Sequence, residues 1–387
     1  MNEKTVIFTA HCGWGLYKFR YSLLEELNNE VKKLYLVSPY DKYVDELKKS
    51  GFHWIRWNMN RRSINPLKEL KAVLDLYNIY KKINPNIVHH DTTKPSLYGS
   101  IAAKIINLSS PSDNNIEVIN SFLGIGYIWS SHAEAKIIRA FVKPLMRLAL
   151  RGSISRTTFS NSADRRTFIE NGLVTPERSQ VLSSEFVNTS EFFPRGYGSS
   201  TESKFAGSQV RIVMASRLLW DKGVQEFVDA ASVLCQKHGD QVEFVLAGEP
   251  DKKGRGWIPE QQLKKWNSRG VVNWIGHCDA MPSLLRSADI AVLPSQYNEG
   301  LPRFLVEAAA TGLPIVASDL AGCRRVVVNQ ANGFLIEPGS VEDLISRLST
   351  LINSPERRAE MGEKSRLKAQ KEYSDSVMIK KWMNMYK

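Results

Sequence analysis

The regular alternation of short apolar runs with helix-like segments constrains the fold of this 387-residue chain more than any other feature. In the first half, the expected strands are 5–10, 34–38, 86–90, 116–120, 157–160 and 179–182. The helices expected between them are 19–29, 66–83, 95–107, 134–150 and 162–171. In the second half, strands are expected near 210–215, 242–247, 271–275, 289–293, 314–317 and 333–336. Because alternating strands and helices form parallel sheets covered on both faces, we expect an α/β protein with two doubly wound, Rossmann-like domains.

The chain length and one unpatterned segment indicate where these domains divide. A chain of 387 residues is more than one hydrophobic core usually supports. Residues 195–208 are rich in Gly, Ser and charge and have no periodicity, as is typical of a linker or surface loop. We therefore expect a first domain over 1–194, a linker over 195–208, a second domain over 209–370 and a final helix within 371–387.

Composition excludes several classes of protein. No apolar run approaches the roughly 18 residues of a spanning helix, and the N-terminus enters a strand without the pattern of a signal peptide. The four cysteines are scattered without metal-ligand spacing, which suits a cytoplasmic protein and predicts no zinc site or disulfide framework. The net charge of +12 indicates an anionic partner: a nucleic acid, a phosphate compound or an anionic membrane surface. No nucleic-acid-binding motif accompanies it, so we expect no nucleic acid.

Two glutamates, Glu299 and Glu307, flank a segment that predicts a helix start after a buried strand. Pro302 suits a first helical turn, and the backbone amides of Gly300 and Leu301 before it form a candidate anion site. Glu299 and Glu307 can accept hydrogen bonds from hydroxyl groups on either side of that anion, so the segment is suited to a sugar nucleotide. The alternative is that Glu299 caps the helix and Glu307 lies on its solvated face.

A second motif places two cations in a strand-to-helix loop. Arg217 and Lys222 follow the apolar run 210–214 and precede an amphipathic helix from about 224 to 236. Open parallel sheets bind ligands at the carboxyl ends of their strands, where Arg217 and Lys222 could hold a diphosphate. The alternative is a solvated basic surface.

Together these motifs resemble the E-x7-E and R-L-x-x-x-K-G motifs of retaining glycosyltransferases of the GT-B type, family 4. The resemblance implies two Rossmann-like domains facing a cleft, with a last helix that crosses back to the first domain. It implies that Arg217, Lys222 and the amides of Gly300 and Leu301 stabilise the leaving diphosphate, that Glu299 positions the donor sugar and that Glu307 binds the ribose. The loop with Gly276 and His277 is expected near the base. The resemblance implies no metal and no cofactor, and the sequence lacks a DxD pattern.

In the first domain, Gly13 and Gly15 permit a tight turn after the first strand, and family members use this loop for donor phosphate or acceptor. Residues 84–104 and 118–127 resemble a sub-group that builds bacterial surface polysaccharides on a lipid carrier. Lys94 and Gly124 in these stretches are therefore expected to bind substrate. Many relatives have His where this chain has Leu123, so no role for a histidine is carried over.

Apolar and basic residues intermix at helical spacing in 137–155, which is typical of a helix on an anionic membrane. The alternative is a core helix with basic edges. The resemblance as a whole implies transfer of a sugar, N-acetylhexosamine by expectation, from a UDP-sugar to a polyprenyl-diphosphate-linked saccharide. Such an enzyme would be peripheral on the inner face of the cell membrane. Two alternatives stay open: a transferase using another nucleotide sugar or a soluble acceptor, and a non-catalytic binding protein of the same fold.

Overall fold

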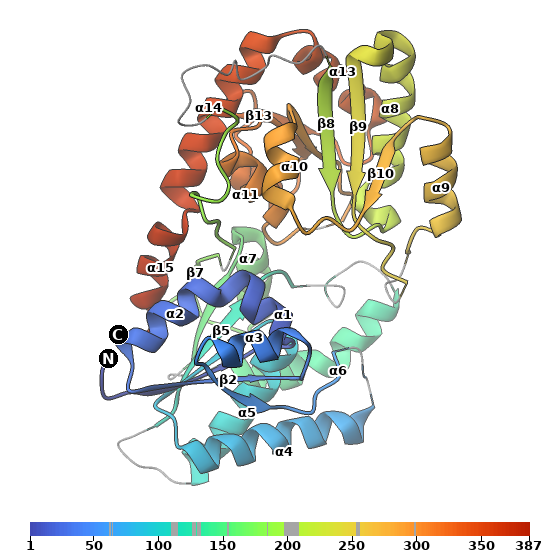
Figure 1. Cartoon of the computed structure of the whole chain (residues 1–387). Coiled ribbons are helices and arrows are strands. Elements are labelled where there is room, and N and C mark those ends of the chain that lie inside the picture. The colour runs from blue at the N-terminus through green and yellow to red at the C-terminus, as the bar shows by residue number, and fades with distance from the viewer. Residues whose placement is uncertain are drawn as a thin grey trace. The chain divides into compact units, whose positions relative to one another are not determined.

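The computed structural model describes residues 1–61, 63, 65–109, 115–125, 129, 133–152, 155–183, 185–196, 209–252, 256–297 and 299–387. The contacts divide the chain into two compact units. The first unit contains residues 1–185 and 378–387, and the second contains residues 186–377 (Figure 1). Each unit is built on a parallel β-sheet with covering helices, which confirms the expected α/β fold class. Most of the linker predicted over 195–208 lies outside the described residues.

The first unit is a seven-stranded sheet in the order β3-β2-β1-β4-β5-β6-β7, with every pairing parallel. Its strands are β1 (Thr5–Thr9), β2 (Lys33–Ser38), β3 (His53–Arg56), β4 (Ile87–Asp91), β5 (Glu117–Phe122), β6 (Ser155–Phe159) and β7 (Ser179–Val181). Its helices are α1 (Gly13–Gly15), the π-helix η1 (Leu16–Arg20), α2 (Tyr21–Glu30), α3 (Tyr43–Lys49), α4 (Pro66–Ile83), α5 (Thr93–Ser109), α6 (Ala133–Leu150) and α7 (Ser162–Glu170). Among the elements of this unit that the sequence analysis did not predict, β3 and α3 are short, and β3 lies at the sheet edge with exposed or half-buried residues.

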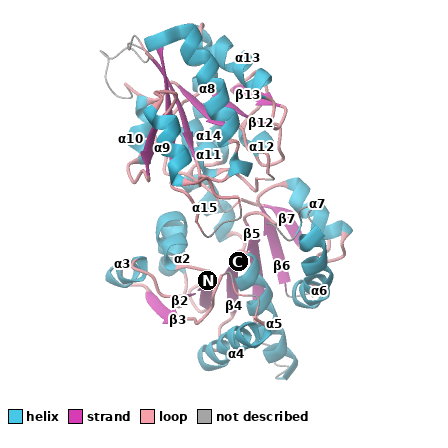
Figure 2. Ribbon diagram, turned by 90° about the vertical axis from the view of Figure 1, so that its right-hand side faces the viewer, coloured by secondary structure: helices cyan, strands magenta, loops and turns pink. Residues whose placement is uncertain are grey.

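Helix α4 shows how local sequence sets these elements. The side chain of Asn65 accepts hydrogen bonds from the backbone amides of Leu67 and Lys68, and Pro66 occupies the first helical turn. Leu76 and Tyr80 are buried on the face toward the sheet. The helix ends at Asn84, whose left-handed conformation is tolerated by asparagine better than by most residues. In Figure 2, α4 and α5 lie on the opposite side of the strands from α2 and α3.

The end of the chain belongs to the first unit. Helix α15 (Asp375–Met383) brings Trp382 to this unit, where its indole Nε1 donates to the carbonyl of Ser183 at 3.0 Å. The ring of Trp382 stacks on His89 with 5.1 Å between ring centroids, and the hydroxyl of Tyr386 is hydrogen bonded to Nδ1 of His89. Residues 378–387 thus belong to the first unit, and Met378, Trp382, Met383, Met385 and Tyr386 are buried there.

The second unit is a six-stranded parallel sheet in the order β10-β9-β8-β11-β12-β13. Its strands are β8 (Val210–Ala215), β9 (Val242–Ala247), β10 (Asn273–Gly276), β11 (Ile290–Leu293), β12 (Ile315–Ser318) and β13 (Gly333–Ile336). Its helices are the short 3-10 helices η3 (Trp220–Lys222) and η4 (Gly239–Gln241), then α8 (Val224–His238), α9 (Glu260–Ser268), α10 (Met281–Ser287), α11 (Arg303–Ala310), α12 (Cys323–Val326), α13 (Val341–Ile352) and α14 (Pro355–Glu372). All six strands were expected within two residues of these bounds. Among the described helices of the whole chain, none has the length and apolar character needed to cross a bilayer.

Two buried histidines at the end of β4 predict acid sensitivity. His90 is bonded through Nε2 to the Tyr80 hydroxyl at 3.0 Å and through Nδ1 to Oδ1 of Asn120 at 2.8 Å. Burial lowers the pKa of His90 from 6.5 to about 4 and also lowers the pKa of His89. His89 and His90 are therefore strand-end histidines whose ring nitrogens are hydrogen bonded inside the first unit.

Because the native His90 resists protonation while the unfolded one binds a proton below pH 6.5, stability should fall as the pH drops from 6.5 toward 4. The loss should be roughly 3 kcal/mol from His90 at pH 4, measured by urea unfolding followed by fluorescence. The variant His90→Gln should show a weaker pH dependence, whereas the exposed control His53→Gln should behave as the wild type. An equal pH dependence in wild type and His90→Gln would contradict this assignment.

Candidate active site

The candidate residues of the second unit gather where its strand order reverses. Strand β8 is the first of this sheet along the chain, yet β9 pairs on one side of it and β11 on the other. The loops after β8 and β11 therefore diverge from the same point at the carboxyl edge, which is where doubly wound sheets bind ligands. Lys222 lies in the first of these loops and Glu299 in the second.

Lys222 and Glu299 are in direct contact across this point. The ammonium Nζ of Lys222 lies 2.6 Å from Oε1 of Glu299, and the two side chains are only 12% and 14% exposed. Because both side chains are largely sheltered from solvent, this charge-assisted contact fixes their positions relative to one another. The structure thus brings together a cation and a carboxylate that the sequence places 77 positions apart.

Backbone contacts hold the Lys222 loop against the end of β11. Gly223 has a φ of +77°, and a Cβ at this position would lie 1.9 Å from the carbonyl oxygen of Pro294, so only glycine fits. The carbonyl of Asp221 accepts hydrogen bonds from the backbone amide of Gln296 at 2.9 Å and from the hydroxyl of Ser295 at 3.2 Å. These contacts place Lys222 by means of backbone geometry rather than side-chain packing.

The peptide after Glu299 is supported from the next strand. A Cβ on Gly322, which precedes α12, would lie 2.4 Å from the carbonyl oxygen of Glu299 and 2.5 Å from that of Gly300. The loop after β12 therefore packs directly on the Glu299–Gly300 backbone. Sequence reasoning missed Gly322, since a single glycine before a short helix carries no local signal of such a contact.

Glu307 lies in α11 and is buried. Its Oε1 accepts a hydrogen bond from Nε of Arg303 at 2.7 Å, one helical turn earlier. Arg303 also donates to the carbonyl of Phe186, so it ties the start of α11 to the first residue of this unit. The alternative of a solvated Glu307 is thus wrong. Pro302 is the residue that precedes the helix, and no described side chain caps it. Arg303 was missed, although its spacing of four from Glu307 is a recognisable helical pair.

Arg217, Gly276 and His277 lie at the same sheet edge with different surroundings. Nη1 of Arg217 is 3.1 Å from Oδ2 of Asp251, and the Arg217 side chain is 59% exposed, which leaves it accessible to a ligand. Gly276 ends β10 with a φ of +70°, and its carbonyl accepts from the amide of Gly248 at 2.7 Å. His277 follows it as an exposed side chain.

Two of the first-unit candidates, Gly13 and Lys94, are in close contact with other residues of that unit. Gly13 is buried, and a Cβ there would lie 2.6 Å from Oδ1 of Asp41, whose other carboxylate oxygen accepts from the amide of Trp14. Lys94 is occupied, since its Nζ donates to the carbonyls of Asn60 and Ser63 and pairs with Glu69 at 2.7 Å. These contacts fix Gly13 and Lys94 within the first unit, and the substrate-binding roles expected for both stay predictions.

Gly15 is in α1 and Gly124 is in the half-buried loop after β5. The other two positions of that loop motif, Gly126 and Tyr127, lie outside the described residues. Sequence reasoning passed over His11, whose Nδ1 lies 3.2 Å from the Thr92 hydroxyl at the point where this sheet reverses its order. Burial, with Arg61 and Arg20 nearby, lowers the pKa of His11 to about 4, so it is neutral at pH 7. Within the described part of the chain, no cluster of His, Cys, Asp and Glu side chains could hold a metal ion.

Comparison with known protein families places both units in the same chemistry. Residues 199–368 match the model of "Glycosyl transferases group 1", and residues 5–160 match the model of "Glycosyl transferase 4-like". These two matches between them include the Lys222 and Glu299 loops and most of the first unit.

Among similar proteins is the N,N'-diacetylbacillosaminyl-diphospho-undecaprenol alpha-1,3-N-acetylgalactosaminyltransferase of Campylobacter jejuni. It is 27% identical over 98% of this chain and 97% of its own length. An Escherichia coli UDP-Gal:alpha-D-GlcNAc-diphosphoundecaprenol alpha-1,3-galactosyltransferase is 25% identical over 74% of this chain and 71% of its own.

Two solved structures share the fold. A glycosyltransferase from Rickettsia africae superposes with a TM-score of 0.78 at 19% identity, covering 100% of this chain and 98% of its own. The Anabaena protein HepE in complex with UDP and glucose superposes with a TM-score of 0.76 at 18% identity, covering 99% of both chains. At these identities the likeness concerns the fold alone.

Proposed function

This chain belongs to the group 1 glycosyltransferases, and on that premise we propose that it is a retaining enzyme that transfers a sugar from a UDP-sugar to a polyprenyl-diphosphate-linked saccharide. The donor we propose is a UDP-N-acetylhexosamine, and the pathway is assembly of a bacterial surface glycan. The observation that carries the proposal is the end-to-end likeness to a transferase whose name specifies a diphospho-undecaprenol acceptor.

The Lys222–Glu299 pair supports a donor site at the reversal point of the second sheet. In our proposal, Lys222 and Arg217 stabilise the negative charge that develops on the leaving UDP, together with the amides of Gly300 and Leu301. Glu299 then positions hydroxyl groups of the donor sugar, and Glu307 binds the ribose. Because these cations take the place of a metal ion at the diphosphate, we propose that no metal or cofactor is required. The acceptor hydroxyl attacks the sugar from the same face that the leaving UDP departs from, as retention requires.

A donor and acceptor panel tests this function. Purified protein is incubated with each of several UDP- and GDP-sugars and with either a lipid-diphosphate-linked saccharide or the matching free saccharide, and nucleotide release is measured. We expect release above background for a UDP-N-acetylhexosamine with the lipid-linked acceptor, and unchanged release in excess EDTA. Faster release with GDP-sugars or with the free saccharide would contradict the proposal and favour a transferase that uses another nucleotide sugar or a soluble acceptor. Complete loss in EDTA that is restored by Mg²⁺ would contradict the metal-independent mechanism.

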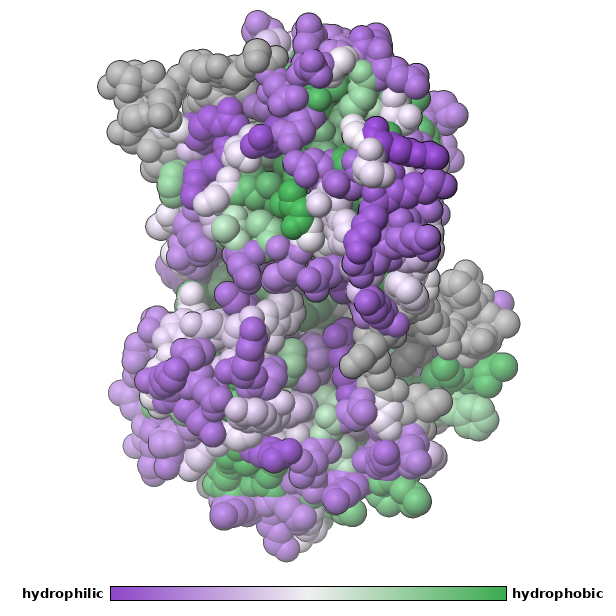
Figure 3. All heavy atoms as spheres, turned by 45° about the vertical axis from the view of Figure 1, so that its right-hand side comes forward, coloured by the Kyte–Doolittle hydropathy of each residue, from purple (hydrophilic) through white to green (hydrophobic). Residues whose placement is uncertain are grey.

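We further propose that α6 holds this enzyme at the anionic inner surface of the cell membrane. One face of α6 is buried, with Met146, Ala149 and Leu150 in the core, but a second apolar face is exposed. This face comprises Ile137, Phe141, Leu145 and Leu148, whose side chains are 49–75% exposed. Figure 3 shows hydrophobic side chains at the surface where α6 lies, on the right of the first unit. The exposed cations Lys136, Arg147 and Arg151 border them and suit an anionic lipid surface.

The membrane proposal predicts the effect of a triple substitution. Ile137→Gln/Phe141→Gln/Leu145→Gln should reduce co-sedimentation with anionic vesicles at least about 100-fold, because burying each such side chain is worth about 1.5–3 kcal/mol. The matched control Val233→Gln/Val328→Gln/Leu367→Gln changes three exposed apolar residues of the second unit. The control should bind vesicles as the wild type does. Equal binding of the α6 variant and the wild type would show that this face does not contact lipid.

A further inference from the structure

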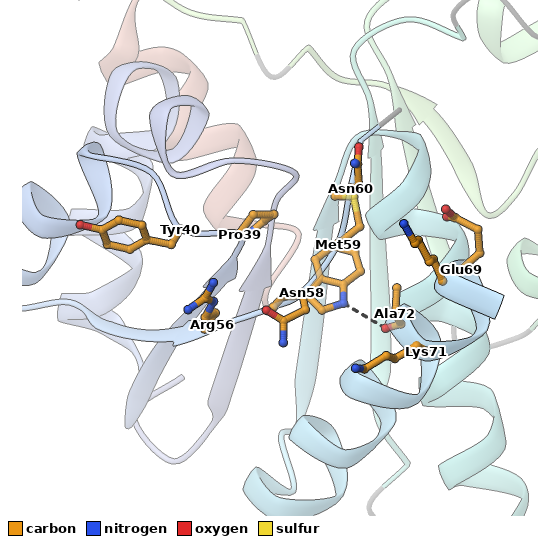
Figure 4. A pocket seen from close by; sticks show the side chains of 11 residues that line it. Pro39, Tyr40, Arg56, Asn58, Met59, Asn60, Glu69, Lys71 and Ala72 are labelled. Atoms are coloured by element: carbon orange, nitrogen blue, oxygen red, sulfur yellow. Dashed lines mark hydrogen bonds between the residues drawn. The ribbon is translucent and has the colours of Figure 1, made fainter. Parts of the chain in front are cut away.

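A pocket in the first unit carries three cations that the proposed donor chemistry does not use. It lies at the carboxyl ends of β2 and β3 and has a volume of about 300 Å³. Its walls come from Pro39 and Tyr40 after β2, from residues 56–60 at the end of β3, and from the first half of α4 (Figure 4). Trp57 is fully buried and joins two of these walls, since its Nε1 donates to the carbonyl of Ala72 at 2.9 Å.

The cations of this pocket are Arg56, Lys68 and Lys71, and all three are exposed. Within the part of the chain that the structure describes, none of them forms an ion pair. The acidic side chain on the wall, Glu69, is already engaged by Lys94 at 2.7 Å and by the hydroxyl of Tyr98. The pocket therefore presents an excess of positive charge to any ligand that enters it. In Figure 4, Arg56 projects from the end of β3 and Lys71 from α4, with Asn58 between them in this view.

Helix α4 also carries an apolar face beside these cations. Leu67, Leu70 and Leu74 are 77%, 57% and 50% exposed, and their spacing of three and four places them on one side of the helix. This side is opposite to the buried residues Leu76 and Ala72, so it faces away from the core. Lys68 and Lys71 line the pocket and lie next to the leucine face on the same turns of the helix. A ligand that fits both features has an anionic group at one end and a hydrocarbon chain at the other.

We infer that this pocket binds the diphosphate of the lipid-linked acceptor and that Leu67, Leu70 and Leu74 contact the first part of its polyprenyl chain. The inference rests on the proposed function, because it assigns a place on the first unit to the acceptor of that reaction. Guanidinium and ammonium groups form charge-assisted hydrogen bonds with phosphate oxygens. A diphosphate has enough oxygens to bind all three cations of the pocket at once. The saccharide on the diphosphate then extends from the carboxyl edge of the sheet, where substrates of α/β folds are bound.

The test measures binding of geranyl diphosphate, a ten-carbon isoprenyl diphosphate, to the full-length protein by isothermal titration calorimetry. Saturating UDP is present throughout to occupy the donor site. The variant Arg56→Gln/Lys68→Gln/Lys71→Gln should bind geranyl diphosphate about tenfold to a hundredfold more weakly than the wild type, as expected for lost charge-assisted contacts. The matched control Lys32→Gln/Lys82→Gln/Arg166→Gln removes the same charge from exposed positions of the same unit and should bind as the wild type does. Equal affinity of the pocket variant and the wild type overturns the inference.

Two further ligands separate a lipid diphosphate from a free one. Inorganic diphosphate should bind more weakly than geranyl diphosphate, and geraniol, which lacks the phosphates, should not bind measurably. The variant Leu67→Gln/Leu70→Gln/Leu74→Gln should bind geranyl diphosphate more weakly than the wild type and bind inorganic diphosphate with unchanged affinity. Equal binding of inorganic and geranyl diphosphate would overturn the assignment to a lipid. Absence of sugar transfer by the wild type would count against the proposed function instead, because these measurements do not depend on turnover.

Discussion

Replacing Lys222 by alanine is expected to lower turnover about 100-fold or more, the scale of losing one group that stabilises charge in a transition state. Lys222 is 12% exposed and pairs with Glu299, so its loss removes a fixed cation and also leaves that carboxylate without this partner. Arg217→Ala should cause a loss of similar size, because Arg217 would act on the same diphosphate. Its partner Asp251 is only 19% exposed, but Arg217 itself is mostly solvent-accessible, so folding should be little affected.

The measurement is the initial rate of nucleotide release at saturating donor and acceptor, with thermal unfolding recorded for each variant. Lys237→Ala, which removes an exposed cation from the end of α8, is the matched control and should retain the wild-type rate. If Lys222→Ala and Arg217→Ala both kept the wild-type rate, these residues could not be the diphosphate ligands.

Substitution of Glu307 and substitution of Glu299 are expected to affect different steps of the reaction. Glu307→Ala should weaken the binding of UDP itself, because Glu307 is assigned to the ribose. Glu299→Ala should bind UDP with nearly the wild-type affinity but transfer sugar at least about 100-fold more slowly, since it is assigned to hydroxyl groups of the donor sugar. Calorimetry with UDP and single-turnover transfer with the UDP-sugar measure the two effects separately.

The ion pairs of the structure supply a control for this comparison. Glu307 pairs with Arg303, so part of any effect of Glu307→Ala on UDP binding could come from displacement of Arg303 at the start of α11. Arg303→Gln keeps Glu307 and removes the pair, and it should weaken UDP binding less than Glu307→Ala does. Weaker UDP binding in Glu299→Ala than in Glu307→Ala would mean that the two roles are reversed.

Strand periodicity predicted six of the seven strands of the first sheet and all six of the second. Val210–Ala215 and Val242–Ala247, for example, are buried over their last four residues, and a short apolar run between turn residues is a local signal of this burial. Among the elements that escaped, β3 and α3 are short, and β3 is a partly exposed edge strand. A short strand that is only half-buried shows a weak hydrophobic pattern, so its place in the sheet depends on pairing with β2 more than on its own sequence.

The motifs with Arg217, Lys222, Glu299 and Glu307 were also evident from sequence, because their residue types and spacing are local properties. Their partners were not. The contacts Lys222–Glu299 and Arg217–Asp251 join loops that follow different strands, and they form only when β8, β9 and β11 pair side by side. For the same reason, the sequence could not show that Lys94 pairs with Glu69.

By itself, then, the sequence determined the fold class, the two parallel sheets and the segments that carry the transferase motifs, since each follows from patterns within a few residues of chain. Tertiary structure alone decided which charges are paired and which apolar residues stay exposed. The leucines of α4 illustrate the difference: Leu67, Leu70 and Leu74 have the same hydrophobicity as the buried Leu76. Only the packing of the helix against its sheet determines which of them meets the core and which meets the solvent, because burial depends on neighbours that are distant along the chain.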